Sequence, residues 1–477
     1  MTADLALRPP VIASGEQYEI VPVYREVLAD HITPVAAFAQ LAEPGAPGFL
    51  LESGPDAGGV ARYSYIGYRP RLLPVHAGDP LAALGPLLDR TVAPVPGLPP
   101  FFGGVLGYLG YESARHFEKL PLSAGAPPGL PESAFLTCDD MVVFDNATRR
   151  VLLLTTHRPR EESYDEALAR LTEIEQRLLG TPPSIVARPL SRQPQTDLLA
   201  GWESNVTRAE FEKRVLRAKE YIAAGDAFQI VLSQRFSKPL AADPIDLYRH
   251  LRATNPSPYM YHVNLGDGRH IVGASPELLV KNEGPRILTR PLAGTRPRGP
   301  DVPSDLALET QLLADEKECA EHVMLVDLGR HDLGRVTVPG TVRVDELMRV
   351  ERFSHVMHIS STVSGELVPG RTGLDALRSA FPAGTLSGAP KIRAMEIIAE
   401  LETEQRGVYG GAIGCFGYGG VTDVAIALRT LVIADGQVHV QAGAGIVADS
   451  DPAAEYLETC HKAGAVLAAV RAAEASA

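Results

Sequence analysis

The chain is short of cysteine and has no long apolar run. Its four cysteines, Cys138, Cys319, Cys415 and Cys460, lie far apart among 477 residues and form no CxxC pair. This spacing indicates reduced thiols in a cytosolic protein rather than a disulfide framework. No apolar run approaches the roughly 20 residues that a membrane helix needs, so we expect no membrane partner. The N-terminal MTADLALRPPV also lacks the apolar core of a signal peptide.

Positive charge is also in short supply. The chain has 45 Lys and Arg against 58 Asp and Glu, a formal net charge of -13 and a pI of about 5.5. A nucleic-acid partner is therefore not expected, because phosphate binding draws on clustered cations. The composition, 45% hydrophobic and 22% charged, is that of an ordinary globular protein with room for two or three domains.

Carboxylates instead recur in pairs on two predicted helices. Glu318 and Glu321 lie three residues apart in ADEKECAEHVMLVDLGRHDLGR, and Glu455 and Glu458 repeat that spacing in DPAAEYLETCHK. Two carboxylates about 4 Å apart repel by roughly 4 kcal/mol near a protein surface. If the helices meet, the four acids need a cation, and oxygen ligands without a Cys or His pair favour Mg²⁺. The alternative is two solvated helices that never meet.

Residues 1–180 are predicted to form an N-terminal domain of short strands. Strand patterns cover 48–54, 62–68 and 101–112, followed by a hairpin over 141–156 and a helix over 164–179. Residues 181–200 are predicted to be a linker, because 181–197 is rich in Pro, Ser, Arg and Gln without apolar periodicity. A second domain then covers 201–477.

Three polar residues interrupt apolar strands in the second domain. Gln229 lies inside the buried strand 227–236, where it needs either a core partner or a ligand. Glu277 follows the break Ser275-Pro276 in strand 270–280, and a carboxyl held there has a raised pKa suited to a general acid. The alternative is that Glu277 is an ordinary surface acid. Two histidines, His355 and His358, lie in the predicted strand 354–367, and the alternative for them is a structural role.

Glycine-rich segments and an arginine complete the candidate anion contacts. Residues 290–299 are predicted to be a turn with three arginines, and Gly443–Gly445 a turn before a helix that starts at Pro452. Arg429 is predicted on an apolar face of the strand 422–434, where its guanidinium needs an anion. The loop GTLSGAPK is not a phosphate loop, because it lacks the GK[ST] ending. Together these features suit Mg²⁺ and a small polyanionic substrate.

The motifs as a set resemble one family. RPLAGTRPRG, DEKECAEHVMLVDLGRHDLGRV, HVMHISSTVSG, FPAGTLSGAPK, YGGAIG, ALRTLV and QAGAGIVADSDPAAEYLET resemble the large subunit of anthranilate synthase, a chorismate-using enzyme. The match covers nearly all of 207–470. The resemblance implies a two-domain α/β (α+β) fold, with large, mostly antiparallel sheets packed as a sandwich and helices outside.

The resemblance also implies an activity and partners. The family converts chorismate and ammonia to anthranilate and pyruvate in the first step of tryptophan biosynthesis. A glutamine amidotransferase subunit supplies the ammonia, so a hetero-oligomer is expected.

Site residues follow from the same motifs. The resemblance makes Glu321 and Glu458 the Mg²⁺ ligands, with Glu318 and Glu455 as their neighbours in the metal site. It makes Glu277 the acid for the leaving ring hydroxyl, and it puts His358 and Thr385 along the ring, with His358 assisting the loss of pyruvate. Gln229 replaces the lysine base of water-using relatives. The implied substrate contacts are Gly294, Thr295, Tyr409, Arg429, Gly443, Ala444, Gly445 and Lys462.

The resemblance further implies feedback inhibition by L-tryptophan. The matching segments supply Leu51, Glu52 and Ser53 from the first domain and Asn255, Pro258, Tyr259 and Met260 from the second. A carboxylate suits the ammonium of the effector, and Tyr and Met suit its indole. The alternative is that these residues are ordinary strand ends.

Related activities differ at single positions. Aminodeoxychorismate synthases carry lysine where this chain has Ala293, and isochorismate or salicylate synthases carry lysine at position 229. A non-catalytic regulatory paralogue is disfavoured, because each expected acid and anion contact is present. One departure from the family pattern is His331, where asparagine is usual.

Overall fold

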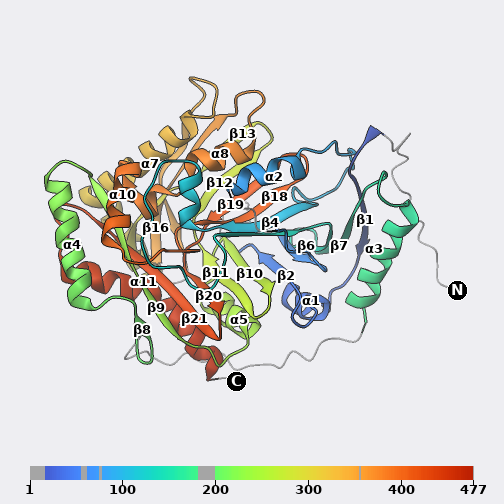
Figure 1. Cartoon of the computed structure of the whole chain (residues 1–477), viewed down its shortest axis with the longest axis horizontal. Coiled ribbons are helices and arrows are strands. Elements are labelled where there is room, and N and C mark those ends of the chain that lie inside the picture. Colours follow the sequence, from blue (N-terminus) through green and yellow to red (C-terminus); the bar gives the residue numbers. More distant parts are fainter. Residues whose placement is uncertain (1–16, 55–61, 75–77, 181–198, 354–355, 476–477) are drawn as a thin grey trace.

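The structure is a computed structural model that describes residues 17–54, 62–74, 78–180, 199–353 and 356–475. The predicted linker segment 181–197 and His355 lie outside these residues. Helices are interspersed with runs of consecutive antiparallel strands along the chain, and the strands form two large sheets that run through the middle of the molecule (Figure 1). The predicted fold class is confirmed.

The first sheet has 12 strands, and all of its pairings are antiparallel. Its order is β1 (Val21–Val27), β7 (Arg150–His157), β6 (Asp140–Asp145), β3 (Tyr63–Gly67), β2 (Gly48–Glu52), β10 (Tyr259–Gly266), β11 (Arg269–Ser275), β20 (Thr430–Ala434), β21 (Gln437–Ile446), β9 (Gln229–Pro239) and β17 (Gly388–Ala389), with β8 (Glu203–Ser204) beside β9.

The second sheet has nine strands. Its order is β14 (Leu292–Pro297), β16 (Val356–Glu366), β13 (Arg286–Thr289), β12 (Leu278–Glu283), β19 (Thr422–Ile426), β18 (Ala412–Gly417), β4 (Gly104–Leu109) and β5 (Ser133–Thr137), with β15 (Arg343–Arg352) beside β16.

The strands of the two predicted domains mix in both sheets. In the first sheet β2 pairs with β10, and in the second β4 pairs with β18. Each sheet is therefore continuous across the predicted boundary at 181–200, and the division into domains stays a prediction.

Helices cover the outer faces of the two sheets. They are α1 (Pro34–Leu41), α2 (Pro80–Leu88), α3 (Tyr164–Leu178), α4 (Arg208–Ala223), α5 (Pro244–Thr254), α6 (Val302–Ala314), α7 (Glu316–Gly334), α8 (Gly373–Ala380), α9 (Gly384–Ser387), α10 (Lys391–Leu401), α11 (Pro452–Glu474) and the 3-10 helix η2 (Tyr111–His116). A capping box of Thr207 and Glu210 starts α4, and Pro452 is the first residue of α11 as predicted.

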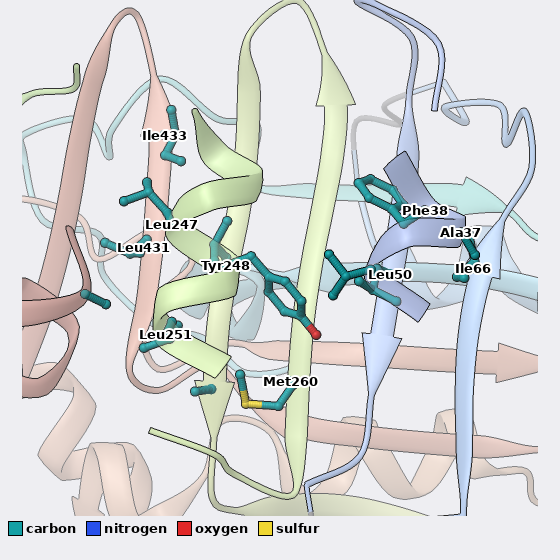
Figure 2. Packing of buried hydrophobic residues seen from close by; sticks show 14 of the residues in the cluster. Ala37, Phe38, Leu50, Ile66, Leu247, Tyr248, Leu251, Met260, Leu431 and Ile433 are labelled. Atoms are coloured by element: carbon teal, nitrogen blue, oxygen red, sulfur yellow. The ribbon is translucent and has the colours of Figure 1, made fainter. Parts of the chain in front are cut away.

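Three hydrophobic clusters fill the layers between these elements. One lies between the sheets and includes Phe49 of β2, Leu106 of β4 and Ile271 of β11. A second joins the outer face of the first sheet to α1, α3, α5 and α11, and Figure 2 shows part of it. A third joins the second sheet to α2, α7 and α8. The layers thus run helix, sheet, sheet, helix.

The chain passes from one sheet to the other at two adjacent breaks. The predicted break at Ser275-Pro276 separates β11 of the first sheet from β12 of the second. The prediction of one strand over 422–434 is wrong, because β19 and β20 belong to different sheets. Arg429 lies at this second break with a φ of 46°, and not on an apolar strand face.

Two further predictions need correction. The segment 290–299 contains strand β14, with a register shift between Ala293 and Thr295, rather than a free turn. Gly443–Gly445 lie within β21 and pair with β9, so their backbone is extended. Helix α7 continues through Gly329 to Gly334, and an added Cβ at Gly329 would lie 3.2 Å from Cγ2 of Thr289 in β13. No helix in the described ranges is long and apolar enough to cross a membrane, and all four cysteines are free.

A buried ion pair just after α10 joins this part of the chain to α9 and to strand β9 of the first sheet. Arg406 donates to both oxygens of Glu402, at 2.7 and 2.8 Å, and to the carbonyls of Leu386 and Val231 at 2.7 Å. Glu402 also accepts from the backbone N–H and hydroxyl of Ser233. Arg406 is 2% exposed and Glu402 4% exposed, so neither charge has water to replace a lost partner.

We therefore expect Arg406→Met to lower the free energy of unfolding by about 3–5 kcal/mol, measured by urea denaturation, because Glu402 is left buried and unpaired. The matched control is Arg330→Met, since Arg330 pairs with Asp327 on the surface and the loss there should stay below about 1 kcal/mol. Equal losses in the two variants would contradict the assigned role of the Arg406 pair.

Candidate active site

Hydrogen bonds between the two breaks hold Glu277 and Arg429 in place. The N–H of Ala274 donates to the carbonyl of Arg429 at 3.2 Å, and the N–H of Ile426 donates to the carbonyl of Glu277 at 3.1 Å. The Ser275 hydroxyl donates to the Ile426 carbonyl at 2.6 Å. Both functional side chains therefore come from irregular backbone at the seam between the sheets.

Glu277 is a buried carboxyl with an unusual acidity. It is 5% exposed, and burial raises its pKa to about 8. The N–H of Leu292 donates to Oε1 at 3.2 Å, and Thr385, Arg429 and Lys462 also act to lower the pKa, with smaller effects than burial. At neutral pH the carboxyl is therefore largely protonated, which gives it the proton that a general acid needs.

Arg429 is a cation without a protein counter-ion. No carboxylate of the described residues lies within ion-pair distance of its guanidinium. Burial lowers the pKa of Arg429, and Glu277 is the acid whose charge acts on it. A partly buried, unpaired guanidinium next to an acid that is neutral at pH 7 suits an anionic ligand.

Gln229 contacts one of the paired glutamates, Glu321. Its Nε2 donates to Oε1 of Glu321 at 2.8 Å, whereas its own Oε1 is buried with no hydrogen-bond partner among the described residues. Gly445 has no side chain, and an added Cβ there would lie 2.6 Å from Nε2 of Gln229. Gln229 is thus only half satisfied by the protein, which favours a ligand contact over a purely structural core role.

The acids of α7 and α11 act on each other. Burial raises the pKa of Glu321, and the charges of Glu318 and Glu458 raise it further. Burial likewise raises the pKa of Glu455, with a further contribution from Glu458. The carboxylates of the two helices are therefore close enough for their charges to act on each other, and a shared metal site stays a prediction.

The donor chemistry of this region fits Mg²⁺, although the carboxylates are not gathered into a cage. Among the described residues, no group of three or more His, Cys, Asp or Glu is close enough to hold a metal. Glu318 accepts from Arg296 at 3.2 Å, and Glu458 pairs with Lys462 at 2.7 Å. Mg²⁺ commonly binds one or two carboxylates and completes its shell with water and substrate, so Mg²⁺ at these acids stays a prediction that needs no cage of carboxylates.

His358 is held as a neutral base. Its Nδ1 lies 3.0 Å from the carbonyl oxygen of Gly294 and 3.1 Å from the hydroxyl of Thr295. Burial lowers the pKa of His358 to about 4, and Nε2 is buried without a partner among the described residues. Because a carbonyl can only accept, Nδ1 carries the proton and Nε2 keeps a free lone pair.

The remaining predicted contacts are also brought close together. Lys462 donates to the carbonyl of Gly443 at 3.1 Å, and an added Cβ at Gly443 would lie 2.8 Å from the Tyr409 hydroxyl. Ala444 lies between the two glycines in β21. Sequence reasoning missed the N–H of Leu292 on Glu277, since a backbone contact leaves no side-chain signal, and the pairing of Arg296 with Glu318.

The predicted effector segments lie side by side. Strands β2 and β10 pair with Met260 opposite Glu52 and Tyr261 opposite Leu51. Glu52 accepts from the Tyr248 hydroxyl at 2.7 Å and pairs with Arg252 at 2.7 Å, two partners that the sequence did not predict. Figure 2 shows Tyr248 beside Met260.

Polar groups of these segments also reach their surroundings. The Tyr259 hydroxyl donates to Asp423 at 3.0 Å, and the Ser53 hydroxyl lies 3.4 Å from the Tyr63 carbonyl. Nδ2 of Asn255 is buried without a partner among the described residues. Pro258 stands next to Tyr259 at the start of β10.

The profile of the chorismate binding enzyme family matches residues 78–468. The chain belongs to the chorismate-binding enzymes. It is 68% identical over 473 residues to anthranilate synthase component 1 of Streptomyces coelicolor, covering 98% of this chain and 93% of that one. It is 48% identical over 472 residues to the component 1 of Thermus thermophilus, covering 96% and 99%.

Solved structures agree with this membership. Anthranilate synthase component I from Streptococcus pneumoniae is 36% identical and superposes with a TM-score of 0.76 over 93% of this chain and 99% of that one. The menaquinone-specific isochorismate synthase of Escherichia coli, 18% identical with a TM-score of 0.71 over 96% of both chains, shares the fold. This chorismate-binding enzyme is thus similar to anthranilate synthase component I, as its motifs predicted.

The raised pKa of Glu277 makes the stability of this chorismate-binding enzyme depend on pH. The folded state holds the Glu277 proton up to about pH 8, whereas the unfolded chain loses it near pH 4.5. The contribution of this group to the free energy of unfolding is therefore highest at low pH. It falls as the pH rises from 4.5 to 8, by about 1.4 kcal/mol for each pH unit.

Glu277→Gln should remove this dependence. We expect its free energy of unfolding to exceed that of the wild type by a few kcal/mol at pH 8.5 and by much less at pH 5, measured by urea denaturation. The control is Glu161→Gln, at a side chain that is 72% exposed. A difference that does not change with pH would show that Glu277 ionises normally.

Proposed function

We propose that the chain converts chorismate and ammonia to anthranilate, pyruvate and water, as its relatives' name suggests for them. The observation that carries this proposal is the pairing of a buried, protonated acid, Glu277, with an arginine, Arg429, that lacks a counter-ion. A dicarboxylate with a leaving hydroxyl needs both groups at once. The four free thiols support the expected cytosolic setting.

Glu277 supplies the proton for the first step. As ammonia forms a bond to the ring, the ring C–O bond to the hydroxyl breaks, and Glu277 protonates that hydroxyl so that it leaves as water. The N–H of Leu292 holds Oε1 at 3.2 Å and orients the carboxyl. Arg429 binds a substrate carboxylate, together with the Tyr409 hydroxyl beside Gly443.

Gln229 supports ammonia over water as the nucleophile. Its amide is neutral at every working pH and cannot remove a proton from water, whereas free ammonia attacks without a base. Nε2 is held by Glu321 at 2.8 Å, so the unpartnered Oε1 is the atom left to accept a hydrogen bond from ammonia.

His358 suits the second step. Its Nε2 lone pair is free because Nδ1 donates to the Gly294 carbonyl. This nitrogen is available to take a proton as pyruvate leaves and the ring becomes aromatic. Its pKa of about 4 keeps it neutral at working pH.

Glu321 and Glu458 are proposed to hold Mg²⁺, with Glu318 and Glu455 beside them. When bound, the ion supplies positive charge for the ring carboxylate of the substrate. Without the ion, Lys462 neutralises the charge of Glu458 and Arg296 that of Glu318. A glutamine amidotransferase subunit is the proposed source of ammonia, as component 1 in the relatives' name suggests.

L-tryptophan is the proposed inhibitor, bound where β2 meets the start of β10. Glu52, Met260 and Tyr259 offer a carboxylate, a thioether and an aromatic ring there. Tyr259 lies opposite Ser275 across the β10–β11 pair, two residues from Glu277. A shift of Tyr259 on binding would therefore reach the acid through one strand pairing.

The activity test uses the purified chain with chorismate, Mg²⁺ and an ammonium salt. Fluorescent anthranilate is the expected product. Aminodeoxychorismate, isochorismate or salicylate as the product would replace this proposal with one of the related activities, and no product would favour a non-catalytic binding role.

Loss of either proposed metal ligand should remove most of this activity. We expect Glu321→Gln and Glu458→Gln each to lower the Mg²⁺-dependent rate by about 100-fold, the upper range for damaging a metal site. Glu316→Gln, on the exposed face of the same helix α7, is the control and should keep the wild-type rate. Full activity in either ligand variant would remove that residue from the metal site.

A bulky side chain at position 53 should block tryptophan binding without affecting Glu277. We expect Ser53→Phe to raise the tryptophan concentration for half-inhibition at least about tenfold, a loss of about 1.4 kcal/mol of binding. The rate without tryptophan should stay near that of the wild type, because Ser53 contacts the Tyr63 carbonyl and not the site. Superimposable inhibition curves would place the effector elsewhere.

A further inference from the structure

A small cavity lies beside the proposed general acid. It is lined by Glu277 and Thr385 of the candidate site and by Asp332 of α7, and its volume is about 30 Å³. Most of the remaining wall is aliphatic, from residues such as Leu279 and Leu328. A cavity of this volume with polar groups on its wall holds one water molecule.

A second, larger cavity shares Asp332 with the first. Its volume is about 190 Å³, and its wall includes His331, Arg335 and Lys391 as well as Asp332. Asp332 therefore lies between the small cavity beside Glu277 and a wider space lined by charged groups. The backbone around Asp332 is fixed, because the Ser379 hydroxyl of α8 donates to its carbonyl.

Only one oxygen of the Asp332 carboxylate accepts a hydrogen bond from the described residues. Oδ2 accepts from Nζ of Lys391 at 2.8 Å, and Lys391 also donates to the Ala380 carbonyl at 2.8 Å. No hydrogen bond from a described residue reaches Oδ1. The two side chains are 13% and 11% exposed, so the pair is enclosed but still in contact with solvent. Burial raises the pKa of Asp332, which eases its temporary protonation.

This position matches a need that the proposed reaction creates. Glu277 loses a proton in each turnover and is itself only 5% exposed. Asp332 lines both the small cavity and the larger one, so a proton can reach Glu277 from the larger cavity by way of Asp332. Resting on the proposed function, we propose that Asp332 is a relay residue that returns a proton to Glu277 through one water in the small cavity.

The relay involves two proton transfers and no change in oxidation state. The protonated Asp332 gives its proton to the water, which passes one of its own protons to the Glu277 carboxylate. Asp332 then takes a proton from water in the larger cavity, where the Lys391 ammonium stabilises the carboxylate between transfers. The net result is one solvent proton moved to Glu277.

The experiment compares the first turnover with steady-state turnover in Asp332→Asn. Asparagine keeps the size and one hydrogen bond but cannot carry a proton. Because burial raises the pKa of Glu277 to about 8, the acid starts protonated at pH 7. With enzyme in excess over chorismate, the first turnover should stay within about twofold of the wild type. Steady-state kcat should fall at least about tenfold, less than the roughly 10²–10⁴-fold effect of a direct acid or base because Asp332 acts only in reprotonation, with KM unchanged.

Two controls keep the outcomes distinct. Asp327→Asn, on the exposed side of the same helix, should match the wild type in both measurements. Asp332→Glu, which keeps a carboxyl group, should recover part of the steady-state rate. Equal loss of the first and later turnovers in Asp332→Asn would mark a structural role and overturn the relay, as would no loss in either. Wild-type enzyme that makes no anthranilate would instead overturn the proposed function.

Gly329→Ala carries the same test if Asp332→Asn does not fold. Gly329 lines the small cavity within α7, and an added Cβ would lie 3.2 Å from Cγ2 of Thr289, another residue of the cavity wall. Alanine also suits a helix better than glycine. The added methyl narrows the space for the water, so steady-state turnover should again slow more than the first turnover. Unchanged kinetics in this variant would count against the relay.

Discussion

The site depends on the hydrogen bonds that join two breaks in the backbone at the seam between the sheets. The Ala274–Arg429, Ile426–Glu277 and Ser275–Ile426 contacts fasten the two crossing segments to each other. Each crossing leaves a side chain pointing out of irregular backbone that is nevertheless buried by sheet on both sides. If either crossing slipped by a residue, the acid and the arginine would no longer be neighbours.

This geometry has a free-energy cost that the large core offsets. Arg429 adopts a positive φ, which costs a non-glycine residue about 1–2 kcal/mol. Glu277 is kept neutral rather than charged, and Arg429 has no protein counter-ion. Such unfavourable features persist only where the surrounding structure determines them many times over, and three hydrophobic clusters provide that rigidity. The same burial raises the pKa of Glu277 to about 8, so that its carboxyl keeps a proton near neutral pH.

The comparison of sequence and structure separates local from distant causes. The capping box of Thr207, the start of α11 at Pro452 and the strands around Leu50 and Ile66 were predictable, because each depends on neighbours within a few residues. The break between β19 and β20 was missed, since the apolar run 422–434 reads the same whether it stays in one sheet or changes sheets. Gly443–Gly445 looked like a turn, but pairing with β9 holds them extended. The partner of Glu52, Arg252, lies 200 residues away and left no local signal.

The sequence by itself determined which residues are candidates for the chemistry: paired glutamates at helical spacing, a carboxyl after Ser-Pro, and a glutamine inside an apolar strand. These are properties of residue type and short spacing, which the chain carries before it folds. Only the tertiary structure decided that Glu277 is protonated, that Arg429 has no counter-ion and that Asp332 separates two cavities. Acidity, pairing and cavity shape depend on burial and on contacts between segments up to hundreds of residues apart, and these exist only once both sheets have formed.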